Sequence, residues 1–535
     1  MDYIGSLLNP LLQQATLVAR DPLCNPGAIS LPELKGLEIL AVDAVPTLNY
    51  TFPADSGLEA RDDVFGGNFC NVTVTYTHPG WGDTITVTTY LPFQEEWNER
   101  FIATGGGGLV TGGEHFALIL MAPHLAKGFA VSTTDGGHAS SPAEAMASDI
   151  SWPHSSPGNV NWPLLMDFAS VALHDMSIVG KAVVKAFYGS DPKYSYFFGA
   201  STGGRQGHIL AQRYPHDFDG IIALCPAINW HKFLFSNIYP GMLMGHKQVY
   251  PRACEMEAFR QAAVAACDPL DGLKDGIISR PDLCQFDPRS VIGRGFECDG
   301  TPSTFSSDAA EIARAAWQGP RSATGEFQWY GFGVDADIST PGVGSASTIC
   351  TSESQCSPAR FIISDLWIRY WVKKDASFDV SSVSHEEWDA IFHSSVNEYS
   401  SIIGTVDPDL SAFRRAGGKM LNWHGMADQV IPVSGSVDYY KQVLEKDPNA
   451  QDYYRLYLAP GATHSLVGHV VPETGEVMSA LQDWVENSIA PDTLRATGPA
   501  PFQPEITFER DLCMYPRVQH YRGGDETSSD SFICE

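Results

Sequence analysis

One serine of the chain stands in the setting of an activated nucleophile. Gly199-Ala200-Ser201-Thr202-Gly203 is the single G-x-S-x-G segment of the sequence, and it falls where the apolar run 194–200 meets a stretch with helical spacing. A sharp strand-to-helix turn exposes a serine hydroxyl above a sheet, and small flanking residues let the strained turn form. We therefore predict that Ser201 is a catalytic nucleophile. The alternative is a glycine-rich helix start that packs tightly or binds an anion.

An acid and a base follow Ser201 in the order that such a turn requires. Both are expected on loops at the carboxyl ends of later strands, first the aspartate and then the histidine. Asp428 follows the run 419–425, and His464 follows the run 453–459 through a short glycine-containing loop. We predict that His464 is the general base and that ionised Asp428 fixes its tautomer. His469 is the local rival, and His424 is predicted to be a structural histidine.

The developing oxyanion of an acyl-transfer reaction needs two backbone donors. The residue after the nucleophile, Thr202, is predicted to supply one of them. The second is expected from an earlier strand-loop, and the glycine cluster 105–108 allows a close approach of backbone to substrate. Gly107 is the predicted donor, with a tightly packed turn as the alternative.

The elements around these residues indicate an α/β fold. Two runs of alternating β-branched and polar residues precede a short strand, 100–104, and its glycine cluster. Further on, apolar residues recur at helical spacing over 167–189, and short apolar strands alternate with helices on both sides of Ser201. The same alternation returns from residue 419, with strands at 419–425 and 453–459 and helices at 436–447 and 477–488.

A long middle stretch lacks this alternation and is rich in Cys, Pro and Trp. With 535 residues the chain exceeds the usual size of one hydrophobic core. We predict a discontinuous catalytic domain, residues 1–226 and 402–535, with a lid domain inserted at 227–401.

Charge and composition exclude several classes of protein. A net charge of −29, from 63 acidic against 34 basic residues, argues against nucleic acid and anionic membranes as partners. Runs of about 18 apolar residues are absent from the sequence, so no membrane partner is expected. The sequence also lacks H-E-x-x-H and C-x-x-C pairs, which disfavours a zinc hydrolase.

Signals for the compartment conflict. Eleven cysteines and the sequons Asn49-Tyr-Thr51 and Asn71-Val-Thr73 are typical of the secretory pathway. The first residues lack both a basic region and a compact apolar region with a cleavage site. The compartment, like the oligomeric state, therefore stays open at this point.

Long segments of the chain resemble the tannase and feruloyl esterase family. They include WNERFIATGGGG, GFAVSTTDGGH, YFFGASTGGRQGH, CDPLDGLKDGII, HGMADQVIP, GATHS and the tail LCMYPRVQHYRGGDETSSDSFIC. The resemblance runs almost from end to end. It implies an α/β-hydrolase fold with a large inserted lid, and hydrolysis of esters of phenolic or aromatic acids.

The resemblance also implies a structural Ca²⁺ ion in the lid. The matching segment supplies three carboxylates and two main-chain carbonyl oxygens, those of Asp268, Asp271, Leu273, Asp275 and Ile277. Oxygen donors of this kind suit a hard cation, and the alternative is an acidic Asp-Gly turn. No organic cofactor is expected.

Three disulfides are implied by the resemblance: Cys24–Cys70, Cys267–Cys284 and Cys513–Cys534. Catalytic members of the family usually carry a further cysteine pair next to the serine and the histidine, where this chain has Ala200 and Ser465. An odd number of cysteines leaves at least one unpaired, and Cys225 is the predicted free thiol in a buried strand. Cys298, Cys350 and Cys356 cannot be paired from sequence alone.

The predicted function is hydrolysis of a small-molecule aromatic ester through a Ser-His-Asp triad and an acyl-enzyme. Feruloyl, galloyl and related acyl groups all remain open. One alternative keeps the triad but serves natural-product metabolism, as an intracellular biosynthetic acyltransferase or as a depside or lactone hydrolase. A different class is a non-catalytic binding protein that kept the fold.

Overall fold

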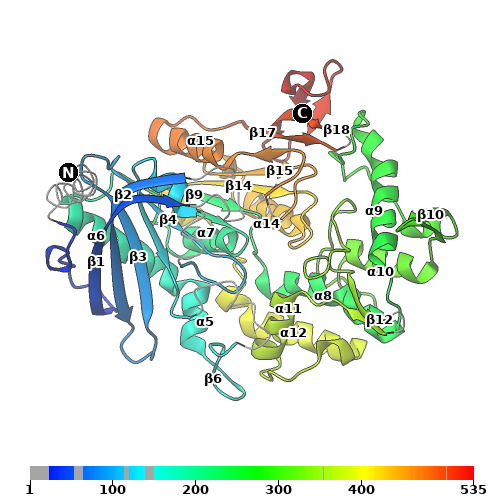
Figure 1. Ribbon diagram of the computed structural model, residues 1–535, viewed down its shortest axis with the longest axis horizontal. Helices are drawn as coiled ribbons and strands as arrows, with labels where there is room; N and C mark the ends of the chain where they lie inside the picture. Colours follow the sequence, from blue (N-terminus) through cyan, green and yellow to red (C-terminus); the bar gives the residue numbers. More distant parts are fainter. Residues whose placement is uncertain are drawn as a thin grey trace, which may run out of the picture. The chain divides into compact units, whose positions relative to one another are not determined.

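The computed structural model describes residues 23–52, 64–113, 120–138, 150–352, 355–464, 466–501 and 503–535 (Figure 1). The chain divides into two compact units, each made of several stretches of sequence. The first unit comprises Met1–Ala145, Trp162–Ile221 and Ala416–Gly418, and the second comprises Met146–Asn161, Ile222–Arg415 and Lys419–Glu535. Ser201 therefore belongs to the first unit, and Asp428 and His464 belong to the second.

Six strands of the first unit form a mixed sheet in the order β1-β2-β3-β5-β4-β8. Pairing is antiparallel from β1 through β3 to β5 and parallel from β5 through β4 to β8. Their bounds are β1 Glu38–Phe52, β2 Val64–Thr77, β3 Ile85–Pro92, β4 Arg100–Thr104, β5 Ala130–Thr134 and β8 Tyr194–Ala200.

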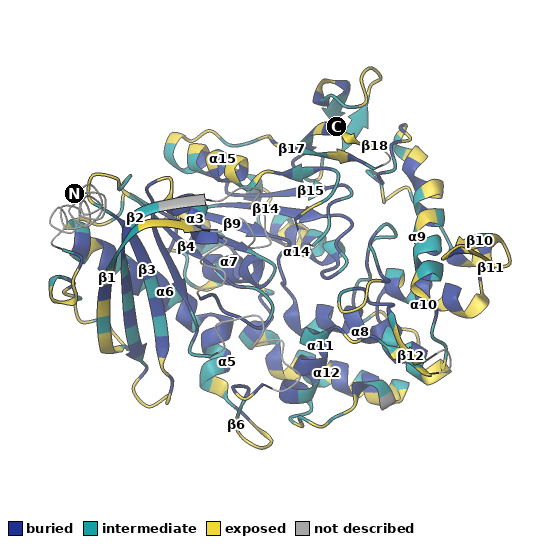
Figure 2. Ribbon diagram, viewed as in Figure 1, coloured by how far each residue is buried: buried dark blue, intermediate teal, exposed yellow. Residues whose placement is uncertain are grey.

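Burial along these strands follows their pairing (Figure 2). The first half of β3 alternates between buried and half-buried residues, as a strand with one solvated face does. In β5 every residue is buried, and in β4 only the first residue is not. The parallel part of the sheet is therefore the core that supports the end of β8, where Ser201 follows.

Four helices complete the described part of the first unit: α3 Ala122–Leu125, α5 Trp162–Ala169, α6 Val171–Tyr188 and α7 Thr202–Arg213. The single helix predicted for 167–189 is wrong at one point, because Ser170, with φ −165° and ψ −32°, separates α5 from α6. Its predicted end is confirmed, since Gly189 terminates α6 in the left-handed conformation at φ 79°.

The second unit repeats the α/β alternation at its carboxyl-terminal end. Strand β9 (Gly220–Leu224) enters this unit at Ile222, and β14 (Lys419–Gly425) pairs in parallel with β15 (Tyr454–Ala459). The helices that follow these two strands are α14 (Val433–Lys446) and α15 (Thr474–Asn487). These strands and helices confirm the alternation that the sequence predicts after residue 419.

Residues 227–401, the predicted lid, are mainly helical with short hairpins. Their principal helices are α8 Trp230–Lys247, α9 Ala253–Cys267, α10 Ser307–Gln318, α11 Ile362–Leu366 and α12 His385–Ile403. Their hairpins are β10 Gly295–Cys298 with β11 Thr301–Thr304, and β12 Thr348–Ser352 with β13 Gln355–Pro358. They fall in the same unit as Asp428 and His464. Their behaviour as a separate lid domain stays a prediction.

Short sheets lie outside the main strands of the second unit. Near its carboxyl end, β16 (Val471–Pro472), β17 (Thr493–Ala500) and β18 (Gln503–Cys513) form one antiparallel sheet, and β19 (Gln519–Tyr521) pairs with β20 (Phe532–Cys534). A two-residue strand, β7 (Asn159–Val160), pairs with β6 (His154–Ser156). Among the described residues, no helix combines the length and the apolar character needed to cross a membrane.

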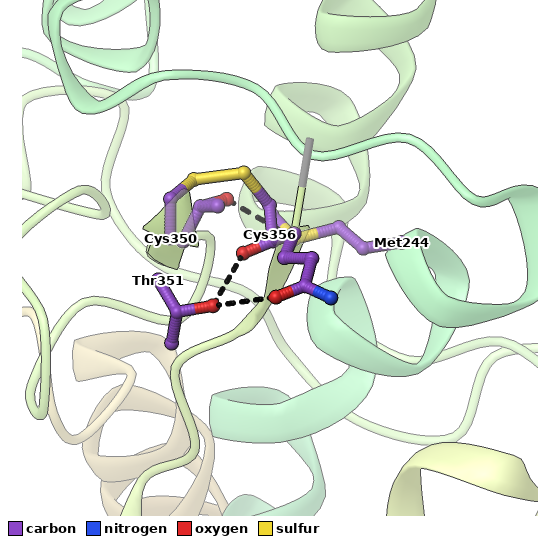
Figure 3. The surroundings of a disulfide bond; sticks show 6 residues. Met244, Cys350, Thr351 and Cys356 are labelled. Carbon is purple, nitrogen blue, oxygen red and sulfur yellow. Dashed lines mark hydrogen bonds between the residues drawn. A yellow bond between two sulfur atoms is a disulfide. The ribbon is translucent and has the colours of Figure 1, made fainter. Parts of the chain in front are cut away.

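Five disulfides are present, and they confirm the three that the family resemblance implies. Cys24–Cys70, Cys267–Cys284 and Cys513–Cys534 are bonded as expected. Two further bridges join Cys254 to Cys298 and Cys350 to Cys356. The second of these closes the β12–β13 hairpin, where the Thr351 hydroxyl also donates to Gln355 (Figure 3). Cys225 is buried and unbridged, as predicted.

Candidate active site

Ser201 occupies a strained turn between β8 and α7. Its φ of 61° and ψ of −120° are unusual for a residue with a side chain, and such strain is stored mainly at functional sites. The motif glycines are required by close packing across the turn. A Cβ atom on Gly199 would lie 2.4 Å from the carbonyl oxygen of Gly203, a backbone atom that cannot move aside. Helix α7 therefore starts directly against the strand that carries the serine.

Helix α7 is mostly buried (Figure 2), and two of its buried side chains, Arg205 and Gln206, make polar contacts that anchor it. The Arg205 guanidinium donates to the carbonyls of Ala169 at 2.8 Å and Phe168 at 3.0 Å. Both carbonyls belong to the last residues of α5. Cationic donors at a helix carboxyl terminus are stabilising. Gln206 accepts from the Gly106 N–H at 3.1 Å and donates to the Thr111 carbonyl at 2.9 Å. These bonds fix the glycine loop against α7.

The glycine loop and the start of α7 present two backbone donors. Thr202 Oγ1 donates to the Gly108 carbonyl at 2.7 Å, so the loop lies beside the residue that follows the serine. The N–H groups of Gly105 and Gly106 have acceptors, whereas those of Gly107 and Thr202 donate to none of the described residues. Two unengaged N–H groups in one neighbourhood are what an oxyanion requires.

Asp428 and His464 meet in the second unit. His464 Nδ1 lies 2.8 Å from Asp428 Oδ2, a hydrogen-bonding distance that keeps the imidazole proton on Nδ1. The Asp428 side chain is fully buried, while 17% of the His464 side chain is exposed. The Gln429 side chain accepts from the His464 N–H at 3.2 Å and holds the histidine loop to the acid loop. One ring nitrogen of His464 is thus engaged by a buried carboxylate.

Both oxygens of the Asp428 carboxylate make hydrogen bonds. Its Oδ1 accepts from the N–H groups of Val430 and Ile431, each at 2.8 Å. His424 Nε2 lies 3.0 Å from Oδ2, and His424 Nδ1 lies 2.8 Å from the Ser436 hydroxyl. His424 is fully buried, so the structural role predicted for it takes the form of a second support for the acid.

The two partners shift each other's pKa in opposite directions. Burial alone would raise the pKa of Asp428, but the charge of His464 and hydrogen bonds from His424 and His464 hold it below the usual value for aspartate. Burial of His464 lowers its pKa, yet the Asp428 carboxylate and Cys225 together outweigh this effect. The pKa of His464 therefore lies well above its usual value.

Cys225 is a neighbour of this pair that sequence reasoning missed. The sequence predicts only a packing role for it. In the structure, the Cys225 sulfur, an Asp428 carboxylate oxygen and a His464 ring nitrogen all lie within 4.8 Å of one another. The thiol interacts with His464 and contributes to the rise of its pKa. Its position directly after β9, at the carboxyl end of a strand, is the signal that could have pointed to it.

The predicted site residues thus fall into two groups. Thr202 and the glycine loop come together beside Ser201 in the first unit, and Asp428 and His464 come together in the second. The rival histidine, His469, hydrogen-bonds the Pro499 carbonyl at 2.8 Å instead. Of the two positions where the family usually has cysteine, Ala200 ends β8, and Ser465 lies outside the described residues.

The loop that the family resemblance assigns to calcium fits a divalent cation by its donor set. Asp268 and Asp275 are buried, and one oxygen of each accepts a backbone N–H at 3.1 Å within the loop. Asp271 Oδ1 accepts the Leu273 N–H at 3.0 Å. The Arg510 guanidinium lies 3.4 Å from Asp275 Oδ2. Three carboxylates with main-chain carbonyls in one loop form the oxygen-rich donor set that a hard divalent ion binds.

A cavity of about 560 Å³ lies in the second unit and touches the acid loop only through Met426. Its other lining residues include Val437, Leu458 and Tyr515, and neither Asp428 nor His464 is among them. We therefore do not assign the cavity to the Asp428–His464 pair.

Comparison with solved structures defines the class of the fold. The chain superposes on a tannin acyl hydrolase from Aspergillus niger with a TM-score of 0.82 and 27% identity, covering 96% of this chain and 95% of that one. Feruloyl esterase B from Aspergillus oryzae gives a TM-score of 0.75 and 26% identity, with coverages of 94% and 98%. The fold is that of the α/β-hydrolases, as predicted.

Comparison of sequences defines the family. A model described as tannase and feruloyl esterase matches residues 70–535. A probable feruloyl esterase from Arthroderma benhamiae is 39% identical over 513 residues, covering 95% of this chain and 93% of that protein. A tannase from Aspergillus oryzae is 29% identical over 541 residues, with coverages of 88% and 87%. The chain belongs to the tannase and feruloyl esterase family and is a carboxylic-ester hydrolase.

Proposed function

We propose that the protein hydrolyses esters of aromatic or phenolic acids with Ser201 as nucleophile, His464 as general base and Asp428 as the residue that orients the histidine. The observation that carries the proposal is the strained backbone of Ser201 at the end of β8. The hydrogen bond between His464 and Asp428 supports it independently. The class of acyl group is supported by two relatives, one named a probable feruloyl esterase and the other a tannase.

The proposed chemistry proceeds in two acyl-transfer steps. His464 accepts the Ser201 proton as Oγ attacks the ester carbonyl, and it returns that proton to the departing alcohol. Water then attacks the acyl-enzyme with the same histidine as base, and the acid is released. Ionised Asp428 stabilises the imidazolium that forms in each step, while the N–H groups of Thr202 and Gly107 receive the oxyanion.

Turnover by matched variants tests this proposal. Methyl ferulate, methyl gallate, chlorogenate and p-nitrophenyl acetate are offered to the wild type, to Ser201→Ala and to Ser190→Ala, an exposed serine at the end of α6. We expect Ser201→Ala to lose at least about 10⁴-fold in kcat/KM, since triad members act as a unit, and Ser190→Ala to match the wild type. Equal rates in Ser201→Ala and the wild type would refute the assignment of the nucleophile.

Two further observations separate the alternatives. Product analysis with added alcohols or amines distinguishes hydrolysis from acyl transfer, because a transferase diverts the acyl group to the added nucleophile. Labelling by a fluorophosphonate distinguishes an enzyme from a binding protein, since only an activated Ser201 reacts. Labelling without turnover of the four esters indicates a triad with a more specialised natural-product substrate.

We also propose that the loop Asp268–Ile277 holds a structural Ca²⁺ ion through Asp268, Asp271 and Asp275 and the carbonyls of Leu273 and Ile277. The three carboxylates of this loop, those of Asp268 and Asp275 buried, support the proposal. Treatment with EGTA should lower the midpoint of thermal unfolding, and added Ca²⁺ should restore it. Asp271→Asn should remove that dependence. A wild type whose unfolding does not respond to EGTA contradicts the proposal.

A further inference from the structure

A buried group of one histidine and three aspartates lies in the first unit and includes none of the residues discussed so far. His78 and Asp83 belong to the turn between β2 and β3, Asp167 lies in α5, and Asp175 lies in α6. All four side chains are at most 11% exposed. Nothing in the proposed ester hydrolysis uses them.

Asp167 is the residue that its surroundings leave unsatisfied. Its side chain is fully buried, and among the described residues neither carboxylate oxygen accepts a hydrogen bond. A buried carboxylate without a donor is costly, and such groups are rare in folded proteins. Asp167 Oδ1 lies 4.0 Å from His78 Nδ1. One ligand atom each from His78, Asp83 and Asp167 lies within 4.8 Å of the others, so the carboxylate is directed at the other two side chains.

His78 is already oriented as a metal ligand usually is. Its Nε2 lies 3.0 Å from Asp175 Oδ2, and the Tyr76 hydroxyl donates to the same oxygen at 3.1 Å. A histidine that binds a metal through one nitrogen almost always gives its other N–H to a carboxylate or carbonyl, which fixes the ring. Asp175 supplies that partner, and it leaves Nδ1 on the side of Asp83 and Asp167.

Asp83 is held through both of its carboxylate oxygens, and a metal ion would replace the proton between Oδ2 and His78 Nδ1. Its Oδ1 accepts from the His78 N–H at 2.9 Å and from the Thr77 hydroxyl at 2.8 Å. Its Oδ2 points to His78 Nδ1 at 2.5 Å. Ligands of one tetrahedral zinc ion at about 2.1 Å lie roughly 3.4 Å apart. The separations of 2.5 Å and 4.0 Å bracket this value, so small shifts of the side chains suffice.

We propose that His78, Asp83 and Asp167 form a site for a divalent transition-metal ion, Zn²⁺ in the first instance, that ties the β2–β3 turn to α5. One imidazole nitrogen with carboxylate oxygens is a donor set typical of Zn²⁺ or Mn²⁺, whereas Ca²⁺ takes six to eight oxygens. The site differs in this respect from the oxygen-only loop Asp268–Ile277. Burial on all sides gives the ion a structural role, because no side is open to substrate.

In the alternative arrangement no metal is bound, and the Asp83 and Asp167 carboxyl groups share a proton. Measurement of metal binding distinguishes the two arrangements. Untagged protein is stripped of metal and titrated with Zn²⁺ against a chromophoric chelator, with Co²⁺ and Mn²⁺ in parallel. The variants are Asp167→Asn and Asp175→Asn, with Asp191→Asn, at an exposed aspartate of the first unit, as the matched control. Asparagine keeps the shape of each side chain and removes its charge.

We expect the wild type to bind one Zn²⁺ ion at this site and Asp167→Asn to bind it at least about 100-fold more weakly. Asp175→Asn should weaken binding by about 10–100-fold, the usual effect of losing the partner that orients a ligand histidine. Asp191→Asn should bind as the wild type does. Zn²⁺ should also raise the unfolding midpoint of the wild type but not that of Asp167→Asn.

A wild type that takes up no transition metal, or an Asp167→Asn variant that takes up as much as the wild type, overturns the proposal. If Asp167→Asn fails to fold by circular dichroism, His78→Gln replaces it as the test variant. Absence of metal uptake together with a more stable Asp167→Asn identifies the shared proton as the true arrangement.

Discussion

At the scale of single residues, the hydrogen bond between Asp428 and His464 decides the pH at which the proposed base can work. His464 accepts a proton only as neutral imidazole, and its pKa lies well above the usual 6.5. Activity that depends on it should be lost as pH falls through this raised pKa. We therefore expect kcat/KM to keep rising above pH 6.5 in the wild type.

Asp428→Asn tests the cause of this raised pKa. Losing the carboxylate removes the main interaction that favours imidazolium, so the acid limb of the kcat/KM profile should move to lower pH. The plateau should fall by roughly 10⁴-fold, because asparagine stabilises the wrong tautomer. Ser190→Ala serves as the control and should keep the wild-type profile. An unchanged acid limb in Asp428→Asn would show that another group titrates.

Sequence reasoning succeeds for residues with a local signal and fails for those that meet only in the fold. The places of Asp428 and His464 after strands β14 and β15 could be predicted, because each follows a recognisable strand by a short loop. Gln206 could not be predicted, since its partners Gly106 and Thr111 lie about a hundred positions earlier in the chain. The contact of Cys225 with His464 was missed for the same reason.

At the scale of elements, the junction of β8 and α7 depends on the absence of one methyl group. Gly199→Ala would place a Cβ atom 2.4 Å from the carbonyl oxygen of Gly203, and the other nearest atoms also belong to the Gly203 backbone. We expect this variant to lose about 3 kcal/mol or more of stability, at the upper end of the usual cost of overpacking, and to lose esterase activity with it.

A second glycine supplies the control for that prediction. A Cβ atom on Gly295, in the exposed strand β10, would meet nothing closer than 3.8 Å. Gly295→Ala should therefore stay within about 0.5 kcal/mol of the wild type in urea unfolding. Equal stability of the two variants would contradict the packing argument at Gly199.

The elements around this junction were predictable to within a few residues. Tyr194–Ala200 and Lys419–Gly425 are strands where the sequence predicts them, because short apolar runs bounded by turns carry a strong local signal. The break at Ser170 was not predictable. Apolar spacing continues across it, and the Arg205 side chain that binds the end of α5 comes from a distant helix.

At the scale of the whole molecule, the disulfides should contribute unequally to stability. Cys24–Cys70 joins residues 46 positions apart, and Cys350–Cys356 joins residues only 6 apart. In the chain-entropy description, losing the longer loop costs about 4 kcal/mol and losing the shorter one about 2 kcal/mol. Double Cys→Ala variants of each pair, compared by urea unfolding, should rank in this order. The reverse ranking would contradict a purely entropic origin.

The α/β-hydrolase fold and the family could be recognised from the sequence, because long segments carry them. The pairing of Cys254 with Cys298 could not, since spacing alone does not determine which cysteines approach each other. The metal site proposed at His78 was equally hidden. Its residues come from a turn and a helix that lie about 85 positions apart.

The spacing of the disulfides also has a consequence for folding during synthesis on the ribosome. Bonded cysteines lie at most 46 residues apart in the sequence. At a translation rate of 5–20 residues per second, the second cysteine of a pair is synthesised within roughly 2–9 s of the first. The bridges are sequential or nested and never interleave, so Cys267–Cys284 can close inside the segment that Cys254–Cys298 closes later. Cys225, the unbridged thiol, is synthesised after Cys70 and before Cys254. Cys24 and Cys70 can therefore bond to each other before Cys225 is synthesised.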